Sequence, residues 1–231
     1  MKLKNWLQGA FVALGIVMLT GCGGSEDVSA PVLLVGTEGA SSIDAAALDA
    51  ALVAYPLQPI SAAESASLSR MREEEQLAHD VFAASLALYP QKPIFARISD
   101  SESTHSAAIK TLLDRYGLPD PLAGLASGGF ASPEIQALHD RLISASQTSL
   151  VAALQVGVEI EELDIQDLTA QMAVVDNRDI LMVYDNLQRA SRNHLRAFWK
   201  VLTAAGGTYT PKYLSQAEFD AIIDAPMETG G

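Results

Sequence analysis

Apolar residues recur at steps of three and four positions over four long stretches of the chain, which is the spacing of one face of an α-helix. Local signals mark where these stretches begin and end. Ser61 and Glu64 have the spacing of a capping box, Tyr89-Pro90 ends the first stretch, and Gly117-Leu118-Pro119 stops the second. Four long helices are therefore predicted, at residues 61–89, 93–116, 148–174 and 177–205.

Two shorter helices are predicted beside the long ones. Ser132-Pro133-Glu134 supplies a cap, a first-turn proline and a first-turn acid, and Ser215-Gln216-Ala217-Glu218 repeats the capping-box pattern. Strand signals are weak, so the simplest arrangement is an all-α, antiparallel four-helix bundle with a short crossover helix and a short C-terminal helix. The connection between the second and third long helices exceeds a tight bundle loop. It can carry the chain from one end of the bundle to the other, as a ferritin-like topology requires.

Polar residues interrupt the apolar face of each long helix near its middle. On the first helix Glu75 lies on this face, whereas Glu74 lies on the neighbouring face with Leu77 and Val81, and spacing leaves the choice between the two glutamates open. The residues in question are Glu75 or Glu74, then Glu102 and His105, then Glu161 or Glu162, and finally Ser191 and His194. A single interruption is typical of an exposed glutamate or a hydrogen-bonded histidine. Four at similar depth indicate that these groups meet inside the bundle.

Carboxylates inside a helical bundle need a compensating charge. Burying one without a partner costs several kcal/mol or forces it to take up a proton. A metal ion removes this cost, and Glu-x-x-His, the spacing of Glu102 and His105, is a known way to hold a metal between helices. The sequence therefore predicts a metal site in the core.

The overall charge and the cysteine content restrict the function further. The chain has 231 residues and a formal net charge of −13, which argues against nucleic acid as a partner. Cys22 is the only cysteine, so a disulfide framework is excluded. Nothing in the sequence identifies a protein partner, and a homo-oligomer is compatible with it.

The N-terminus resembles a bacterial lipoprotein signal. Lys2 and Lys4 precede a short apolar stretch, and Leu19-Thr20-Gly21-Cys22 follows it. Cleavage before Cys22 would leave this residue lipidated and the protein anchored to a membrane in the cell envelope. Gly23, rather than an aspartate, implies the outer membrane facing the periplasm. An uncleaved signal anchor and a simple secretory signal are the alternatives.

The predicted organisation has four parts. After the signal peptide comes a lipidated, flexible tether with one candidate helix at Ile43 to Ala54, and a disordered tail follows the bundle. The expected boundaries are 1–21 for the signal, 22–60 for the tether, 61–224 for the bundle domain and 225–231 for the tail.

Several motifs together resemble one known family, an uncharacterised ferritin-like family called domain of unknown function 2202. The resemblance covers about residues 57–223. It rests on Met71-Arg72-Glu73-Glu74-Glu75-x-Leu77-Ala78, Ser101-Glu102-x-x-His105, Leu112-Leu113-Asp114-Arg115-Tyr116-Gly117-Leu118-Pro119, Ser191-Arg192-Asn193-His194-Leu195-Arg196-Ala197-Phe198 and Tyr209-Thr210-Pro211-x-Tyr213-Leu214-Ser215.

The resemblance implies a set of metal ligands. Ferritin-like di-metal proteins use one Glu from each of two helices and Glu-x-x-His from each of the other two. A more distant similarity to the metal helices of bacterioferritin and rubrerythrin favours Glu162 over Glu161. If a metal binds, Asp164 and Tyr184 are candidate hydrogen-bonding partners of its ligands. The ligands implied in this way are Glu75, Glu102, His105, Glu162 and His194.

Ser191 departs from the ferritin-like pattern, because the fourth helix would carry a glutamate there. A neutral serine is a poor ligand for a divalent transition metal, so a mononuclear or asymmetric site fits this ligand set better than a full di-iron centre. Iron is the first expectation for the metal, with manganese or zinc as alternatives.

Two functions follow as expectations. The first is an envelope lipoprotein that binds a transition metal in its core, with oxidoreductase chemistry on peroxide or oxygen. The second is a non-enzymatic lipoprotein whose histidines and glutamates form a buried hydrogen-bonded network without a metal.

Overall fold

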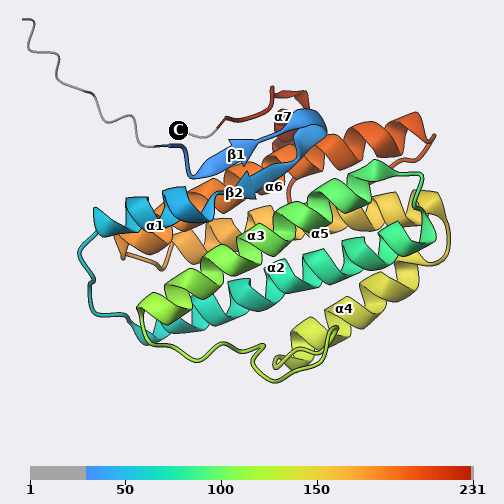
Figure 1. The fold of residues 1–231 in the computed structure, drawn as a ribbon. Coiled ribbons are helices and arrows are strands. Elements are labelled where there is room, and N and C mark those ends of the chain that lie inside the picture. Colours follow the sequence, from blue (N-terminus) through green and yellow to red (C-terminus); the bar gives the residue numbers. More distant parts are fainter. Residues whose placement is uncertain (1–29, 230–231) are drawn as a thin grey trace, which may run out of the picture.

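The structure, a computed structural model, describes residues 30–229 of the chain. Four long antiparallel helices form a bundle in which α2 packs mainly against α3, and α5 mainly against α6 (Figure 1). The prediction of an all-α helical bundle is confirmed. The long helices are α2 (Ala62–Leu88), α3 (Pro93–Arg115), α5 (Leu150–Met172) and α6 (Arg178–Ala204).

Two short helices cover the bundle. Helix α4 (Pro133–Ser146) packs against α2 and α5, and α7 (Gln216–Asp224) packs on α6. The predicted caps are present. Ser61 and Ser215 each form a complete capping box with the glutamate three residues later, at the start of α2 and α7.

The apolar core consists of two clusters at opposite ends of the bundle. Near the α2–α3 turn it contains Val81, Phe82, Phe95, Ile98 and Phe198. At the other end it contains Leu68, Met71, Ile109, Leu112 and Leu187. On α2, α3 and α6 the residues between these clusters are the polar residues that interrupted the apolar pattern, so the bundle has a polar layer across its middle.

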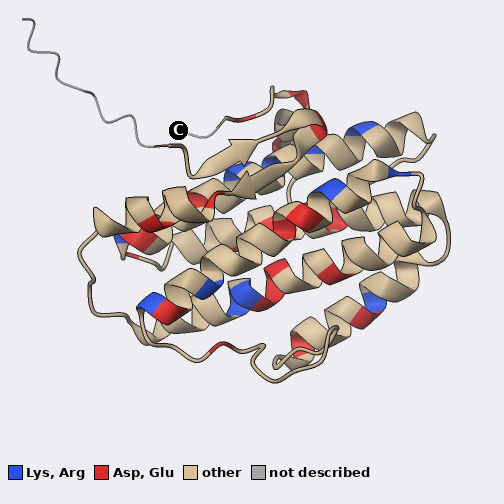
Figure 2. Cartoon of the chain, viewed as in Figure 1, with Lys and Arg blue, Asp and Glu red and all other residues tan. Residues whose placement is uncertain are grey.

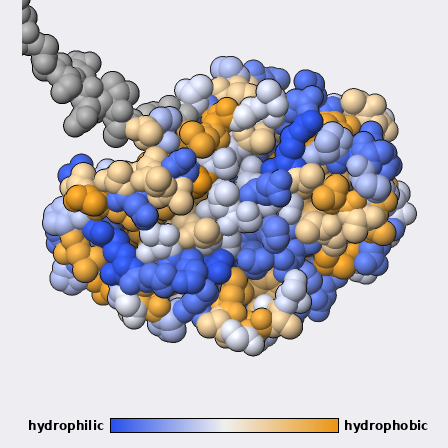
Figure 3. Space-filling view, in the orientation of Figure 1, coloured by the Kyte–Doolittle hydropathy of each residue, from blue (hydrophilic) through white to orange (hydrophobic). Residues whose placement is uncertain are grey.

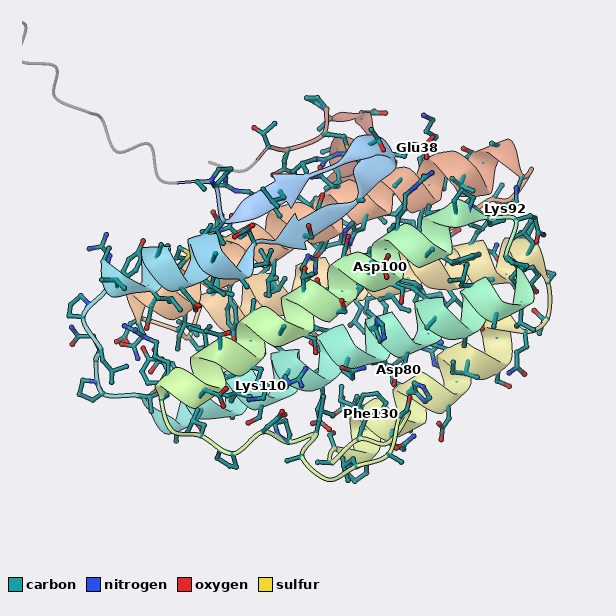
Figure 4. All side chains as sticks on the ribbon, viewed as in Figure 1. Glu38, Asp80, Lys92, Asp100, Lys110 and Phe130 are labelled. Carbon is teal, nitrogen blue, oxygen red and sulfur yellow. The ribbon has the colours of Figure 1, made fainter. Side chains whose placement is uncertain are left out.

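An N-terminal hairpin lies outside the four-helix bundle. Strands β1 (Leu33–Val35) and β2 (Ser41–Ile43) pair antiparallel around the short 3-10 turn η1 (Thr37–Gly39), and α1 (Ala45–Val53) follows. Figure 1 shows the hairpin running along α3 and α6. At its turn Glu38, labelled in Figure 4, pairs with Arg97 of α3.

This arrangement differs from the flexible tether predicted for residues 22–60, although the candidate helix at Ile43 to Ala54 is present as α1. Each strand has only three residues, too few to show a clear alternation in the sequence. The segment is held by apolar side chains that the bundle buries, namely Leu33, Ile43, Leu48 and Leu52.

The C-terminal end also differs from its prediction. Glu228, inside the predicted disordered tail of residues 225–231, accepts hydrogen bonds from Arg192 and Arg196 of α6. Its backbone N–H donates to the Asn193 side chain. The predicted signal peptide and Cys22 lie outside the described residues.

Charged residues of both signs are spread over the helices (Figure 2). Hydrophilic and apolar residues also interleave on the face drawn in Figure 3. Within residues 30–229, no helix is both long and apolar enough to cross a membrane.

Candidate metal centre

The polar layer contains ionisable side chains from all four long helices. Glu102 and His105 stand one turn apart on α3 and face inward, whereas Asp100, labelled in Figure 4, is exposed on the outer side of the same helix. Each inward side chain is at most 3% exposed. The layer consists of Glu75 from α2, Glu102 and His105 from α3, Glu161 from α5 and His194 from α6.

These side chains form two groups that share Glu102. One group is Glu75, Glu102 and His105, and the other is Glu102, Glu161 and His194. Within each group the candidate ligand atoms all lie within 4.8 Å of one another. The two imidazole rings stack with their centroids 5.4 Å apart.

Glu102 stands between the two histidines. Its Oε2 lies 2.7 Å from His105 Nδ1, and its Oε1 lies 2.9 Å from His194 Nδ1. On the outer sides, His105 Nδ1 is 3.3 Å from Glu75 Oε2 and His194 Nδ1 is 3.4 Å from Glu161 Oε2. The arrangement is therefore nearly symmetric about Glu102, with an imidazole and a second carboxylate on each side.

The hairpin determines which nitrogen of His105 faces the carboxylates. His105 Nε2 lies 2.7 Å from the backbone carbonyl of Ser41, which can only accept a hydrogen bond, so Nε2 carries the proton. Nδ1 faces Glu102 Oε2 at 2.7 Å, so this is the nitrogen that a cation would meet in place of a proton. Two further contacts, from Ser41 N–H to Ser101 Oγ and from Asn193 Nδ2 to Ser41 Oγ, hold β2 over the α3–α6 side of the layer.

Several polar atoms of the layer are buried without a hydrogen-bond partner among the described residues. A bundle normally satisfies such atoms, because each one costs free energy when it is left unpaired. A cation placed among them would satisfy several at once. In the layer these atoms are Oε1 of Glu75 and Glu161 and Nε2 of His194, and beside it Oδ1 of Asp164. Glu102 Oε1 and His194 Nδ1 have only ion-pair contacts, including the one with each other at 2.9 Å.

The pKa values respond to burial and to the histidines. Burial raises the pKa of Glu75 and of Glu161 well above the usual range. Burial alone would also raise the pKa of Glu102, but His194 and His105 lower it below its usual value. Burial alone would lower the pKa of His105, yet the adjacent Glu102 carboxylate raises it well above its usual value.

The layer contains more acidic than basic groups. Within residues 30–229, no Lys or Arg forms an ion pair with Glu75, Glu102 or Glu161, so the histidines are the only protein groups that can offset these charges directly. Two histidines can offset at most two of the three carboxylates, so at least one carboxylate must either hold a proton or face a cation from outside the chain. This donor set, with carboxylate oxygens and imidazole nitrogens, suits iron, manganese and zinc.

A small cavity adjoins the layer on the side away from the hairpin. It has a volume of about 20 Å³, enough for one water-sized guest. Its polar lining comes from Glu74, Glu75, Glu102, Glu161 and Asp164, and Leu138 of α4 contributes to its apolar wall.

The predicted ligand Glu162 does not reach the polar layer. Its carboxylate accepts hydrogen bonds from the backbone N–H groups of Lys212, Tyr213 and Leu214, and from the Tyr209 hydroxyl. It therefore holds the loop before α7, and Glu161 takes the inward position. The preference for Glu162 over Glu161 that came from the family resemblance does not match this geometry.

The sequence contained a signal for Glu161. The apolar positions Leu154, Val158, Ile165 and Leu168 continue through residue 161 in steps of four, three, four and three. The other open choice is resolved as well: Glu75 faces the histidines, whereas Glu74 pairs with Arg70 at 2.7 Å.

The two predicted partner residues lie near the layer in different ways. Asp164 accepts a hydrogen bond from Ser191. The Tyr184 hydroxyl is bonded to Ser67 Oγ at 2.8 Å and not to a candidate ligand. Sequence reasoning did not predict the role of Ser41, because its contact with His105 spans 64 positions of the chain.

Fold and site define an all-α four-helix bundle with buried Glu and His groups that could hold a metal ion. Residues 64–226 match the family described as "Uncharacterized protein domain (DUF2202)", and the chain belongs to this family. The hairpin and α1 precede the matched region.

The chain is also similar to an uncharacterised relative and to a solved structure. The chain is 45% identical over 177 residues to "Uncharacterized protein MJ0754" of Methanocaldococcus jannaschii, covering 76% of this chain and 94% of the relative. The crystal structure of hypothetical protein MJ0754 from Methanococcus jannaschii superposes with a TM-score of 0.71 at 44% identity. That match covers 75% of this chain and 98% of the other.

Proposed function

We propose that this protein binds a transition metal in the polar layer of its bundle, with iron as the first candidate and manganese or zinc as alternatives. The observation that carries the proposal is the pair of buried Glu–His groups that share Glu102 and have unpartnered oxygen and nitrogen atoms. A cation would offset the excess carboxylate charge and satisfy these atoms together.

Each residue of the layer has a defined part in this proposal. Glu75, Glu102 and His105 hold one position, and Glu102, Glu161 and His194 hold the other, with Nδ1 as the nitrogen ligand of His105. Iron with such ligands can exchange electrons with peroxide or oxygen, so oxidoreductase activity is the extension of this proposal. The apolar clusters on both sides keep bulk water out of the layer.

Two further parts of the proposal rest on the sequence and the topology. The long α3–α5 connection with its crossover helix supports a ferritin-like bundle. The Leu19-Thr20-Gly21-Cys22 motif supports an envelope lipoprotein anchored through Cys22. Labelling of cells with a radioactive fatty acid, beside a Cys22→Ala variant, tests the anchor: label that persists in the variant would contradict it.

Metal content after native purification tests the central proposal. The protein is purified without chelators from cells supplied with iron, manganese and zinc, and bound metal is measured by inductively coupled plasma mass spectrometry. We expect at least one transition metal ion per chain in the wild type. A His105→Ala, His194→Ala variant should lose at least about 90% of this metal, because removing ligands of a preformed site typically costs tenfold or more in affinity.

His139→Ala is the matched control, since His139 lies outside the layer and pairs with Asp140. It should retain the wild-type metal content. A folded wild-type protein that holds no transition metal under any of the three supplies would contradict the proposal.

One observation favours a metal-free alternative. His105 has both ring nitrogens hydrogen-bonded within the protein, to Glu102 and to Ser41. Such a network can fix the register of a bundle by itself. His194 favours metal binding, because its Nε2 has no hydrogen-bond partner among the described residues and its Nδ1 has only ion-pair contacts, the closer at 2.9 Å from Glu102 Oε1. The metal measurement separates the two functions.

A further inference from the structure

Asp164 is an acidic side chain beside the layer that the two Glu–His groups do not include. It follows Glu161 by one helical turn on α5, so both project toward the same side of the helix. The residue is partly exposed, but its Oδ1 atom is buried and has no hydrogen-bond partner among residues 30–229. Asp164 lines the small cavity together with Glu75, Glu102 and Glu161.

Ser191 holds this carboxylate in place. Its hydroxyl donates a hydrogen bond to Asp164 Oδ2, so Oδ1 is the oxygen that remains without a hydrogen-bond partner among the described residues. Ser191 is buried and stands one turn before His194 on α6, where a second Glu-x-x-His motif would carry its glutamate. Helix α6 therefore lacks a carboxylate at position 191, and Asp164 of α5 places one in contact with that position.

We propose that Asp164 is a fourth carboxylate ligand of the metal centre, positioned by Ser191, and that the completed centre holds two divalent cations that share Glu102. This inference rests on the proposed metal binding. A centre of two ions differs from the mononuclear or asymmetric site that the sequence predicted. That prediction considered the missing glutamate at Ser191 but did not include Asp164 among the ligands.

Charge and donor number both support two ions. Four carboxylates balance two divalent cations when both imidazoles are neutral, whereas three would leave a buried positive charge. The layer then offers six ligand residues, and each ion has a histidine of its own with Glu102 between them. The cavity lined by Asp164 has space for one water-sized guest beside these carboxylates.

Manganese titration of the metal-free, full-length protein tests the inference. Bound Mn²⁺ is counted by mass spectrometry after desalting, and electron paramagnetic resonance reports whether two ions are close enough to couple. Wild type should bind two Mn²⁺ per chain and show a coupled signal. Asp164→Asn, which keeps the size of the side chain and removes its charge, should bind one and show the six-line signal of an isolated ion.

Two variants accompany this measurement. Ser191→Ala leaves Asp164 unanchored and should weaken binding of the second ion by about 10- to 100-fold, the usual effect of removing a partner of a ligand. Asp167→Asn is the matched control, because Asp167 lies one turn further along α5 and pairs with Arg70 instead of Ser191. It should still bind two ions.

The outcomes separate this inference from the proposed function. Two coupled ions in a folded Asp164→Asn variant would overturn the role of Asp164, and a single ion in the wild type would overturn the two-ion centre. Both results would leave metal binding intact. A wild type that binds no ion under iron, manganese or zinc would instead overturn the proposed function.

Discussion

Glu161 and Glu162 are neighbours of the same residue type with different surroundings. Glu161 Oε1 has no hydrogen-bond partner among the described residues, and burial raises the pKa of this side chain well above its usual range. Glu162 accepts hydrogen bonds from three consecutive backbone N–H groups and from a tyrosine hydroxyl. Glu161 therefore has an oxygen available to a cation, whereas Glu162 stabilises the loop before α7.

Replacing each of these two glutamates by glutamine separates their roles. Glu162→Gln should lower the free energy of unfolding by about 1–3 kcal/mol, since an amide offers one acceptor oxygen to donors that now contact two. Its metal content should stay at the wild-type level. Glu161→Gln should lose metal, while the metal-free protein keeps its unfolding free energy or gains some, because the neutral amide removes the cost of burying or protonating the carboxylate.

Urea unfolding of the metal-free proteins and metal analysis after reconstitution measure both effects. If Glu162→Gln lost its metal without becoming less stable, the assignment of the two side chains would be reversed.

At the scale of elements, the N-terminal hairpin closes one side of the polar layer. Ser41 of β2 accepts the hydrogen bond from His105, and Asn193 of α6 donates to the Ser41 hydroxyl. The turn of the hairpin approaches α6 so closely that a Cβ on Gly39 would lie 2.5 Å from the Ala197 Cβ. Gly39 also has a φ of +89°, which L-residues rarely adopt.

Gly39→Ala should therefore displace the hairpin from α6 and withdraw the Ser41 carbonyl from His105. We expect metal affinity to fall by about 10-fold or more, because a metal-binding histidine loses the partner that orients it. Competition with a chromophoric chelator measures the change.

Gly36→Ala is the matched control in the same hairpin. Its Cβ would lie 3.4 Å from the Ala40 carbonyl oxygen, close to ordinary contact, and its φ of −92° suits alanine. It should keep wild-type affinity. Equal affinity in all three proteins would show that the hairpin does not influence the site.

At the scale of the whole molecule, two apolar clusters enclose a layer with a surplus of carboxylates. Bringing such charges together in the folded state opposes folding unless protons or cations accompany them. A metal that binds only the folded state therefore adds to stability by mass action.

Removal of the metal should lower the melting temperature. Free metal at 100 times its dissociation constant adds about 2.7 kcal/mol, and for a chain of this size each kcal/mol corresponds to about 2–4 °C. We therefore expect a fall of about 5–10 °C on chelation, measured by calorimetry or circular dichroism. The His105→Ala, His194→Ala variant should melt at the same temperature with and without chelator. A wild-type melt that does not change after confirmed metal loss would contradict this coupling.

The sequence by itself determined the helices and most of the layer. Helix periodicity and capping depend on residues three or four positions apart, so the pattern predicted all four long helices and the inward positions of Glu102, His105 and His194. Long helices with an apolar face must pack on one another, which was enough to predict a bundle.

Only the tertiary structure decided between neighbouring residues and completed the site. Glu161 and Glu162 both border the inward face, and the donors that turn Glu162 away come from a loop about 50 positions later in the chain. The hairpin that closes the layer and the hydrogen bond that joins Asp164 to Ser191 also link distant segments. Periodicity reports which face of a helix is buried, but the partners that meet that face become known only when the helices are packed.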